Sequence, residues 1–157
     1  MKLRIGEKAP DFILPDQHGE EHSISQYKGE WVLLYFYPKD NTPGCTAEAC
    51  QIRDNMEAFK KLSITVLGVS IDSVDSHKKF ADKHDLPFTL LSDWDKKVVE
   101  LYGVWGKKKF MGKEFMGTKR TSFLIDREGR IVKIYEKVKP AQHGEEVLED
   151  IRRFEAR

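Results

Sequence analysis

Two cysteines, Cys45 and Cys50, are the residues of this chain best suited to nucleophilic chemistry. Cys45 follows an apolar run at residues 31–37, typical of a buried strand, and a Pro- and Gly-containing stretch at 38–44 that leads into a helix. This order predicts that Cys45 lies in the first turn of the helix, where backbone N–H groups without intrahelical partners favour a thiolate over a thiol. Cys45 is therefore a candidate nucleophile, and a small buried apolar residue is the alternative.

Capping residues support this position for Cys45. Thr42 can act as the N-cap, and Pro43 suits the first helical position because its missing N–H costs no hydrogen bond there. Cys45 then becomes the third helical residue. An unperturbed thiol is only about a few per cent thiolate at neutral pH, and we expect the helix start to raise that fraction.

Helix geometry separates the two cysteines. At about 100° per residue, one apolar face should carry Cys45, Ala49, Ile52, Met56 and Phe59, with Glu48 at its edge. Cys50 lies on the polar side, and an intact helix would hold the two α-carbons roughly 8.6 Å apart. A disulfide needs α-carbons closer than about 7 Å. A Cys45–Cys50 bond therefore requires the first turns to unwind, which suggests a redox cycle with a conformational step.

The remaining pattern alternates strands and helices. We expect an N-terminal hairpin over 12–14 and 21–25, strands over 64–71, 88–91, 121–125 and 131–137, and helices over 72–84, 95–102 and 144–154. A turn at 126–129 should join the last two strands into an antiparallel hairpin. The predicted fold is α/β, a mixed central sheet flanked by helices on both faces, in a single domain spanning residues 1–157.

Composition excludes several classes of protein. Lys and Arg number 27 against 26 Asp and Glu, so the overall charge attracts neither nucleic acid nor a membrane. The basic segment that begins with Lys107, Lys108 and Lys109 and ends at Arg120 is expected to be a solvated loop. No segment approaches the about 20 apolar residues of a membrane span, and the N-terminus lacks a secretory apolar stretch. Two cysteines are too few for a disulfide scaffold, so we expect a soluble, cytoplasmic protein.

Several motifs of the chain resemble those of a known family. Residues 38–45 match the Pro-x-x-x-Thr-x-x-Cys signature of peroxiredoxins, and residues 45–50 resemble the C-x4-C arrangement of the Q-type, or bacterioferritin comigratory protein, subfamily. Further matches at 9–12, 92–93, 102–104 and 120–125 extend the resemblance over nearly the whole chain. The resemblance implies a thioredoxin-like fold and thiol-dependent, antioxidant reduction of hydrogen peroxide and organic hydroperoxides. It also implies thioredoxin or a glutaredoxin-like dithiol as reductant, and we expect a monomer or weak homodimer.

The resemblance assigns roles to the two cysteines. Cys45 would be the peroxidatic cysteine, which the peroxide converts to a sulfenic acid. Cys50 would be the resolving cysteine, which condenses with that sulfenic acid to form an intramolecular disulfide.

It also assigns four supporting residues, each of which has a simpler alternative. Thr42 would hydrogen-bond the thiolate and the peroxide, or serve only as a helix cap. Arg120 would stabilise the thiolate and the charge that develops on the peroxide, or be a surface arginine. Pro38 would shield the pocket, or merely end a strand. Glu48 would orient Arg120, or be an ordinary carboxylate at a helix start.

The five histidines show no metal-ligand spacing, so no metal or bound cofactor is indicated. We expect all of them to be surface or capping residues: His18, His22, His77, His84 and His143.

Three other functions stay open on the sequence. A peroxide-sensing switch or holdase would use the same cysteine pair without turnover. A disulfide oxidoreductase would need a C-x2-C pair, which is absent. A cysteine hydrolase would need a histidine base beside Cys45, and the sequence indicates no histidine for that role.

Overall fold

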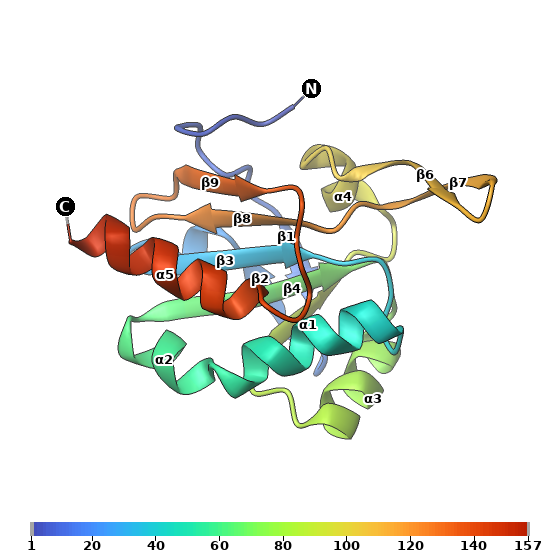
Figure 1. Cartoon of the computed structure of the whole chain (residues 1–157), viewed down its shortest axis with the longest axis horizontal. Helices are drawn as coiled ribbons and strands as arrows, with labels where there is room; N and C mark the ends of the chain where they lie inside the picture. The colour runs from blue at the N-terminus through green and yellow to red at the C-terminus, as the bar shows by residue number, and fades with distance from the viewer. Residues whose placement is uncertain (1, 157) are drawn as a thin grey trace.

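The computed structural model describes residues 2–156, and its centre is a five-stranded sheet of order β5-β4-β3-β8-β9 (Figure 1). Strand β3 (Trp31–Phe36) pairs in parallel with β4 (Ile64–Ser70), which pairs in parallel with β5 (Thr89–Ser92). On its other side β3 pairs antiparallel with β8 (Thr121–Ile125), followed by β9 (Ile131–Tyr135). The predicted mixed sheet is confirmed.

Helices cover both faces of this sheet. Helices α1 (Pro43–Asp54), α2 (Met56–Lys61), α3 (Val74–His84) and α5 (His143–Glu155) share one hydrophobic core with the sheet, and Figure 1 shows α1, α2 and α5 in front of it. Helix α4 (Lys97–Leu101) belongs to a second core on the opposite face. Strand β3 is buried along its whole length because both cores draw on its alternating side chains.

The helix that carries the cysteines is interrupted once. All five residues predicted for its apolar face are buried, as expected. The helix nevertheless breaks at Asn55, whose side-chain Nδ2 donates to the backbone oxygen of Gln51. Because that side chain competes for a helical carbonyl, the chain continues as the separate helix α2.

Two small hairpins complete the fold. The N-terminal pair β1 (Ile13–Pro15) and β2 (Glu21–Ser23), followed by the short 3-10 helix η1 (Ser25–Tyr27), lies within two residues of the predicted hairpin. The expectation of a solvated loop for the basic segment is wrong, because β6 (Trp105–Phe110) and β7 (Lys113–Thr118) form an antiparallel hairpin that projects from the body (Figure 1).

A tight turn explains the second hairpin. Met111 and Gly112 form its two-residue connection, and both have positive φ, 52° and 79°. Such turns match the twist of two paired strands. Within residues 2–156, none of the helices combines the length and the apolarity that crossing a bilayer requires.

Candidate active site

Cys45 lies in the first turn of α1 and is only 1% exposed. Helix α1 begins at Pro43, so Cys45 is the third helical residue, as predicted. Its Sγ accepts a hydrogen bond from Nη2 of Arg120 at 3.3 Å. The pairing of Phe36 with Thr121 explains this contact, because it puts the chain that enters β8 beside the chain that leaves β3 for α1.

Arg120 also holds a carboxylate. Its Nη1 donates to Oε1 of Glu48 at 2.6 Å, and Glu48 lies one turn after Cys45 with its side chain fully buried. Burial raises the pKa of Glu48 to about 7, although the positive charge of Arg120 opposes the shift. The other oxygen, Oε2, has no hydrogen-bond partner among the residues that the structure describes. The guanidinium thus joins the thiol to a carboxylate that is easily protonated.

Gly44 leaves the space that Arg120 occupies. A Cβ atom at this position would lie 3.0 Å from Nη2 of Arg120, closer than side chains normally approach. The residue before Cys45 therefore shapes the site through its missing side chain.

The structure brings Thr42 and Pro38 to the same loop but gives them no bond to Cys45. Thr42 is the N-cap of α1, with extended backbone angles, yet its side chain makes no capping hydrogen bond. Its Oγ1 donates instead to the backbone oxygen of Lys39 at 2.8 Å. Pro38 lies half-buried at the start of the loop.

Cys50 stays apart from Cys45. Both thiols are free, and both lie in the uninterrupted helix α1, where Cys50 is half-buried on a different side. The described conformation is therefore one in which the two cysteines cannot bond, as helix geometry predicts.

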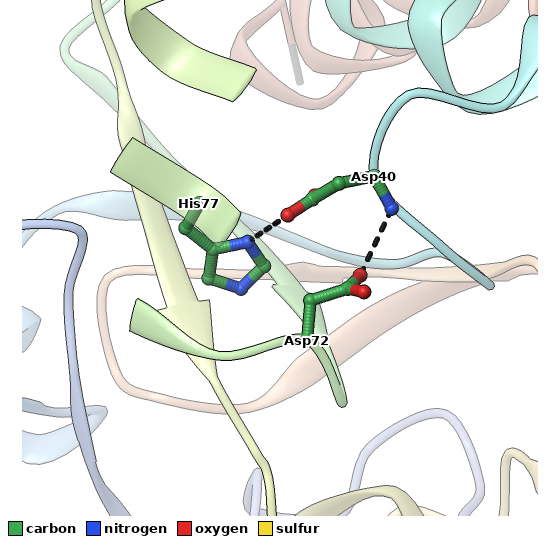
Figure 2. Close-up of side chains that lie close together, drawn as sticks. All are labelled: Asp40, Asp72 and His77. Carbon is green, nitrogen blue, oxygen red and sulfur yellow. Dashed lines mark hydrogen bonds and ion pairs between the residues drawn. The ribbon is translucent and has the colours of Figure 1, made fainter. Parts of the chain in front are cut away.

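A buried polar cluster anchors the loop that leads to Cys45 (Figure 2). Oδ2 of Asp40 lies 2.7 Å from Nδ1 of His77, a residue of α3. The backbone N–H of Asp40 donates to Oδ2 of Asp72 at 2.9 Å. Nε2 of His77 must donate to the backbone oxygen of Leu91, because a carbonyl only accepts.

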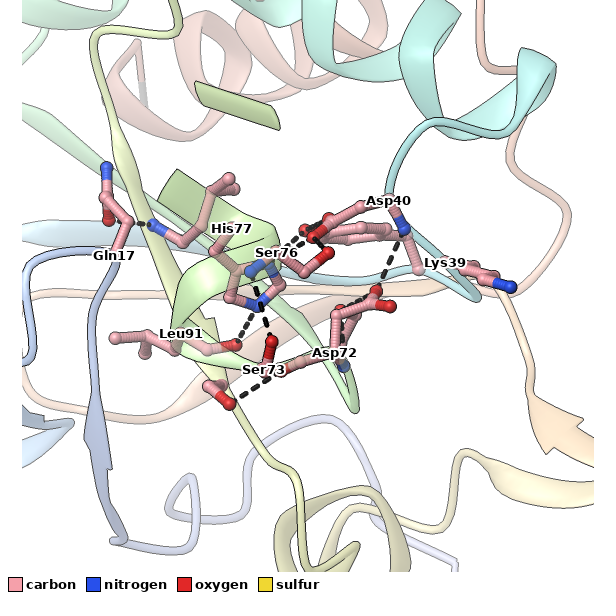
Figure 3. Close-up of polar contacts among 12 residues, drawn as sticks. Gln17, Lys39, Asp40, Asp72, Ser73, Ser76, His77 and Leu91 are labelled. Carbon is pink, nitrogen blue, oxygen red and sulfur yellow. Dashed lines mark hydrogen bonds and ion pairs between the residues drawn. The ribbon is translucent and has the colours of Figure 1, made fainter. Parts of the chain in front are cut away.

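Further donors complete this cluster (Figure 3). Tyr37 donates its hydroxyl to Oδ1 of Asp40 at 2.6 Å, and Ser76 donates to Oδ2 at 2.8 Å. Asp40, Asp72 and His77 are also the one group of described residues whose ligand atoms lie close enough, within 4.8 Å, to hold a metal ion. Their mutual hydrogen bonds explain the grouping without a metal, so the cluster serves to fix the loop.

The expectation that every histidine is a surface or capping residue is wrong for two of them. His77 and His143 have fully buried side chains, and Nε2 of His143 lies 2.7 Å from Oγ of Ser122. The sequence carried a signal for His77, because it shares a helical face with the apolar Phe80 and Ala81 at i+3 and i+4. Neither histidine makes a described bond to Cys45.

The chain is also similar to known proteins. Residues 5–134 match the AhpC/TSA family model. Peroxiredoxin Bcp of Bacillus subtilis is 51% identical over 152 residues, covering 97% of each chain, and Peroxiredoxin Bcp of Escherichia coli K12 is 49% identical over 146 residues, covering 93% of this chain and 94% of its own.

Solved structures show the same similarity. A cysteine-to-serine mutant of Xylella fastidiosa PrxQ superposes with a TM-score of 0.93 over 99% of both chains, at 34% identity. Xanthomonas campestris bacterioferritin comigratory protein, studied for alkyl peroxide reduction, superposes with a TM-score of 0.86 over 91% of both chains, at 36% identity.

The space at Gly44 yields a first prediction. Gly44→Ala should displace the guanidinium of Arg120 and slow the reaction of Cys45 with hydrogen peroxide about ten-fold, the loss of roughly one charge-assisted hydrogen bond. The free energy of unfolding should stay level or rise, because alanine favours a helix by about 1 kcal/mol over glycine. Stopped-flow kinetics and urea unfolding measure the two effects.

Ala47→Gly is the matched control, because Ala47 is an exposed residue of the same helix. It should lower the free energy of unfolding and leave the peroxide rate unchanged. An unchanged rate in Gly44→Ala would contradict the steric role of Gly44.

The buried carboxyl of Glu48 yields a pH prediction. Its pKa is about 7 in the folded protein against an ordinary value of 4.5, so protonation is easier in the folded state. The resulting stabilisation is complete below pH 4.5 and is lost as the pH rises through 7. The side chain in Glu48→Gln cannot ionise. Between pH 4.5 and 7 the unfolding free energy of the unsubstituted chain should therefore fall by about 3 kcal/mol more than that of Glu48→Gln.

Urea unfolding at a series of pH values tests this, in a Cys45→Ser background that removes the thiol titration. The difference between the two chains isolates Glu48 from other titrating groups, including Asp93, whose pKa burial raises to about 6. Parallel pH profiles would show that Glu48 ionises normally in the folded protein.

Proposed function

The chain belongs to the AhpC/TSA family as a peroxiredoxin of the Bcp type, and from this premise we propose which of its residues reduce the peroxide. The protein is a thiol peroxidase. We propose Cys45 as the cysteine that attacks the peroxide. The observation that carries this proposal is the contact of its sulfur, in the first turn of α1, with the guanidinium of Arg120 at 3.3 Å.

In the first step the Cys45 thiolate attacks one peroxide oxygen. A sulfur–oxygen bond forms, the oxygen–oxygen bond breaks, and the leaving oxygen takes a proton and departs as water or an alcohol. Cys45 becomes a sulfenic acid. Arg120 stabilises the thiolate and the charge on the leaving oxygen, since its planar fork can donate to two atoms at once.

Glu48 is the residue that positions Arg120. Its 2.6 Å bond to Nη1 fixes the guanidinium while leaving Nη2 for the sulfur. Thr42 and Pro38 follow from the family motif: Pro38 shields the pocket, and the Thr42 hydroxyl turns from the Lys39 carbonyl to the sulfur and the peroxide.

In the second step the Cys50 thiolate attacks the sulfenic sulfur of Cys45. A disulfide forms and hydroxide leaves, which is released as water after it takes a proton. Because both residues begin in one helix, α1 must unwind between the two steps. A dithiol protein, thioredoxin or a glutaredoxin-like protein, then reduces the disulfide. We further propose that residues 1–157 work as a single domain, as a monomer or weak homodimer, in the cytoplasm.

The alternatives from the sequence find less support. A sensor would react once per chain, whereas the relatives are named peroxiredoxins and one solved structure is described for its alkyl peroxide reduction activity. A hydrolase would need a histidine base, and the two buried histidines are bonded elsewhere, His77 to Asp40 and His143 to Ser122.

Cysteine substitutions test the division of labour. Cys45→Ser should abolish turnover of hydrogen peroxide with thioredoxin. Cys50→Ser should consume one equivalent of peroxide, accumulate the Cys45 sulfenic acid and then stall, because no second thiol resolves it. A coupled assay of reductant oxidation and mass spectrometry of trapped sulfenic acid measure both. Full thioredoxin-linked turnover in Cys45→Ser would refute the assignment of Cys45.

Hydrogen exchange tests the unwinding of α1. In the reduced protein the amides from Thr46 to Arg53 should be protected, because they donate hydrogen bonds within one helix. Oxidation should remove that protection, while the amides of β3 keep theirs as an internal control. If a sample shown by mass to contain the Cys45–Cys50 disulfide kept full protection in α1, the coupling of chemistry to unwinding would be wrong.

A further inference from the structure

The hairpin of β6 and β7 carries a surface that peroxide reduction does not use. Four large apolar side chains are exposed near its turn: Phe110 (66%), Met111 (87%), Phe115 (47%) and Met116 (51%). Among the described residues, the other exposed large apolar side chains are scattered over different parts of the chain: Ile5, Ile13, Trp94 and Leu101. Exposed apolar residues gathered in one place mark an interaction site more often than single ones do.

These side chains surround the hairpin instead of covering one face. In the strand register Phe115 pairs with Lys108 and Phe110 with Lys113, which places these four on one face. Met116 pairs with Lys107 on the opposite face, where Glu114 pairs with Lys109, and Met111 lies in the turn itself. We call residues 107–116 the hairpin tip: apolar on both faces and at its end, with lysines on both faces.

Charge is concentrated in the same place. Residues 105–120 contain six basic residues and one acidic residue, a net charge of +5. Since the whole chain carries +1, the rest of it carries −4. The net charge of the whole chain, which by itself predicts no membrane partner, hides this separation of a basic hairpin from an acidic body. The hairpin therefore attracts an anionic surface that the body repels.

We propose that the hairpin tip docks on an anionic lipid surface, with Phe110 and Met111 inserted among the headgroups and the lysines bound to lipid phosphates. The distribution of side chains favours lipid over a protein partner. A protein would cover one face of a flat hairpin, whereas a lipid interface encloses an inserted tip from all sides. The cations of the tip are all lysines, which extend from an apolar stem to the headgroups, whereas protein interfaces enrich arginine and are depleted of lysine.

Docking at the tip also fixes the orientation of the protein. Strand β7 leads through Lys119 to Arg120, the residue that contacts Cys45. The active site lies at the root of the hairpin, so docking turns that side of the molecule toward the surface.

Vesicle sedimentation tests the proposal with the full chain. The probes are vesicles of phosphatidylcholine alone and of phosphatidylcholine with an equal share of phosphatidylglycerol. We expect binding only to the anionic vesicles, weaker at about 0.5 M than at about 0.1 M salt because exposed charges are screened. Phe110→Ser with Met111→Ser should lower the partition coefficient about ten-fold or more. Lys107→Ser with Lys109→Ser should lower it about five-fold per lysine.

Matched substitutions on the body are the controls. Trp94→Ser removes an exposed apolar side chain, and Lys60→Ser with Lys61→Ser removes two exposed lysines of α2. Both should bind vesicles as the unsubstituted chain does. Hydrogen peroxide reduction in solution should be unchanged in every variant, which shows that the fold and the active site are intact.

Three results would overturn the proposal. The first is no binding of the unsubstituted chain to anionic vesicles. The second is equal binding after Phe110→Ser with Met111→Ser, which would mean that charge alone adsorbs the protein without insertion. The third is a dimer in sedimentation velocity that this double substitution dissociates while vesicle binding is unaffected, which would assign the tip to a second copy of the chain.

Discussion

The site depends on how one guanidinium is shared. Arg120 donates a hydrogen bond from Nη2 to the Cys45 sulfur and another from Nη1 to the Glu48 carboxyl group. Both Cys45 and Glu48 are buried. A buried anion is unfavourable without a partner, so in the proposed reaction a Cys45 thiolate and the Glu48 carboxylate compete for the same positive charge. Burial favours the protonated form of Glu48 and raises its pKa to about 7. When Glu48 is neutral, the positive charge of Arg120 is available to stabilise the proposed thiolate.

The fold brings Arg120 to Cys45 and Glu48 by placing three segments of the chain side by side. A short loop joins the end of β3 to α1, the antiparallel neighbour β8 begins just after Arg120, and Gly44 leaves room for the guanidinium. The loop between β3 and α1 is anchored by Asp40, whose carboxylate lies against His77 and whose backbone N–H donates to Asp72. Because His77 belongs to α3, its contact with Asp40 ties the loop to that helix and so holds the first turn of α1 in place.

The sequence predicted the elements that carry a clear local pattern, but not the contacts between distant residues or the hairpin whose strands lack such a pattern. Apolar runs and capping residues predicted β3, the start of α1 and the place of Cys45. Helical spacing could have indicated that His77 is buried, but its bond to Asp40 joins residues far apart in the chain, which no local pattern marks. The hairpin of β6 and β7 lacks an alternation of apolar and polar residues because both of its faces are exposed, which removes the signal on which strand prediction relies.

The chemistry makes opposite demands on α1, and the helix reflects both. Thiolate stabilisation needs a folded first turn, whereas a Cys45–Cys50 bond needs that turn to open. The ends of α1 are weakly held: Thr42 provides no side-chain cap, which typically contributes about 1 kcal/mol, and Asn55 breaks the helix from α2. The Asp40 anchor lies just before α1, so opening can begin at Thr42 without disturbing the sheet. A firm loop followed by a weakly capped helix thus favours confining the proposed unwinding to the segment that carries both cysteines.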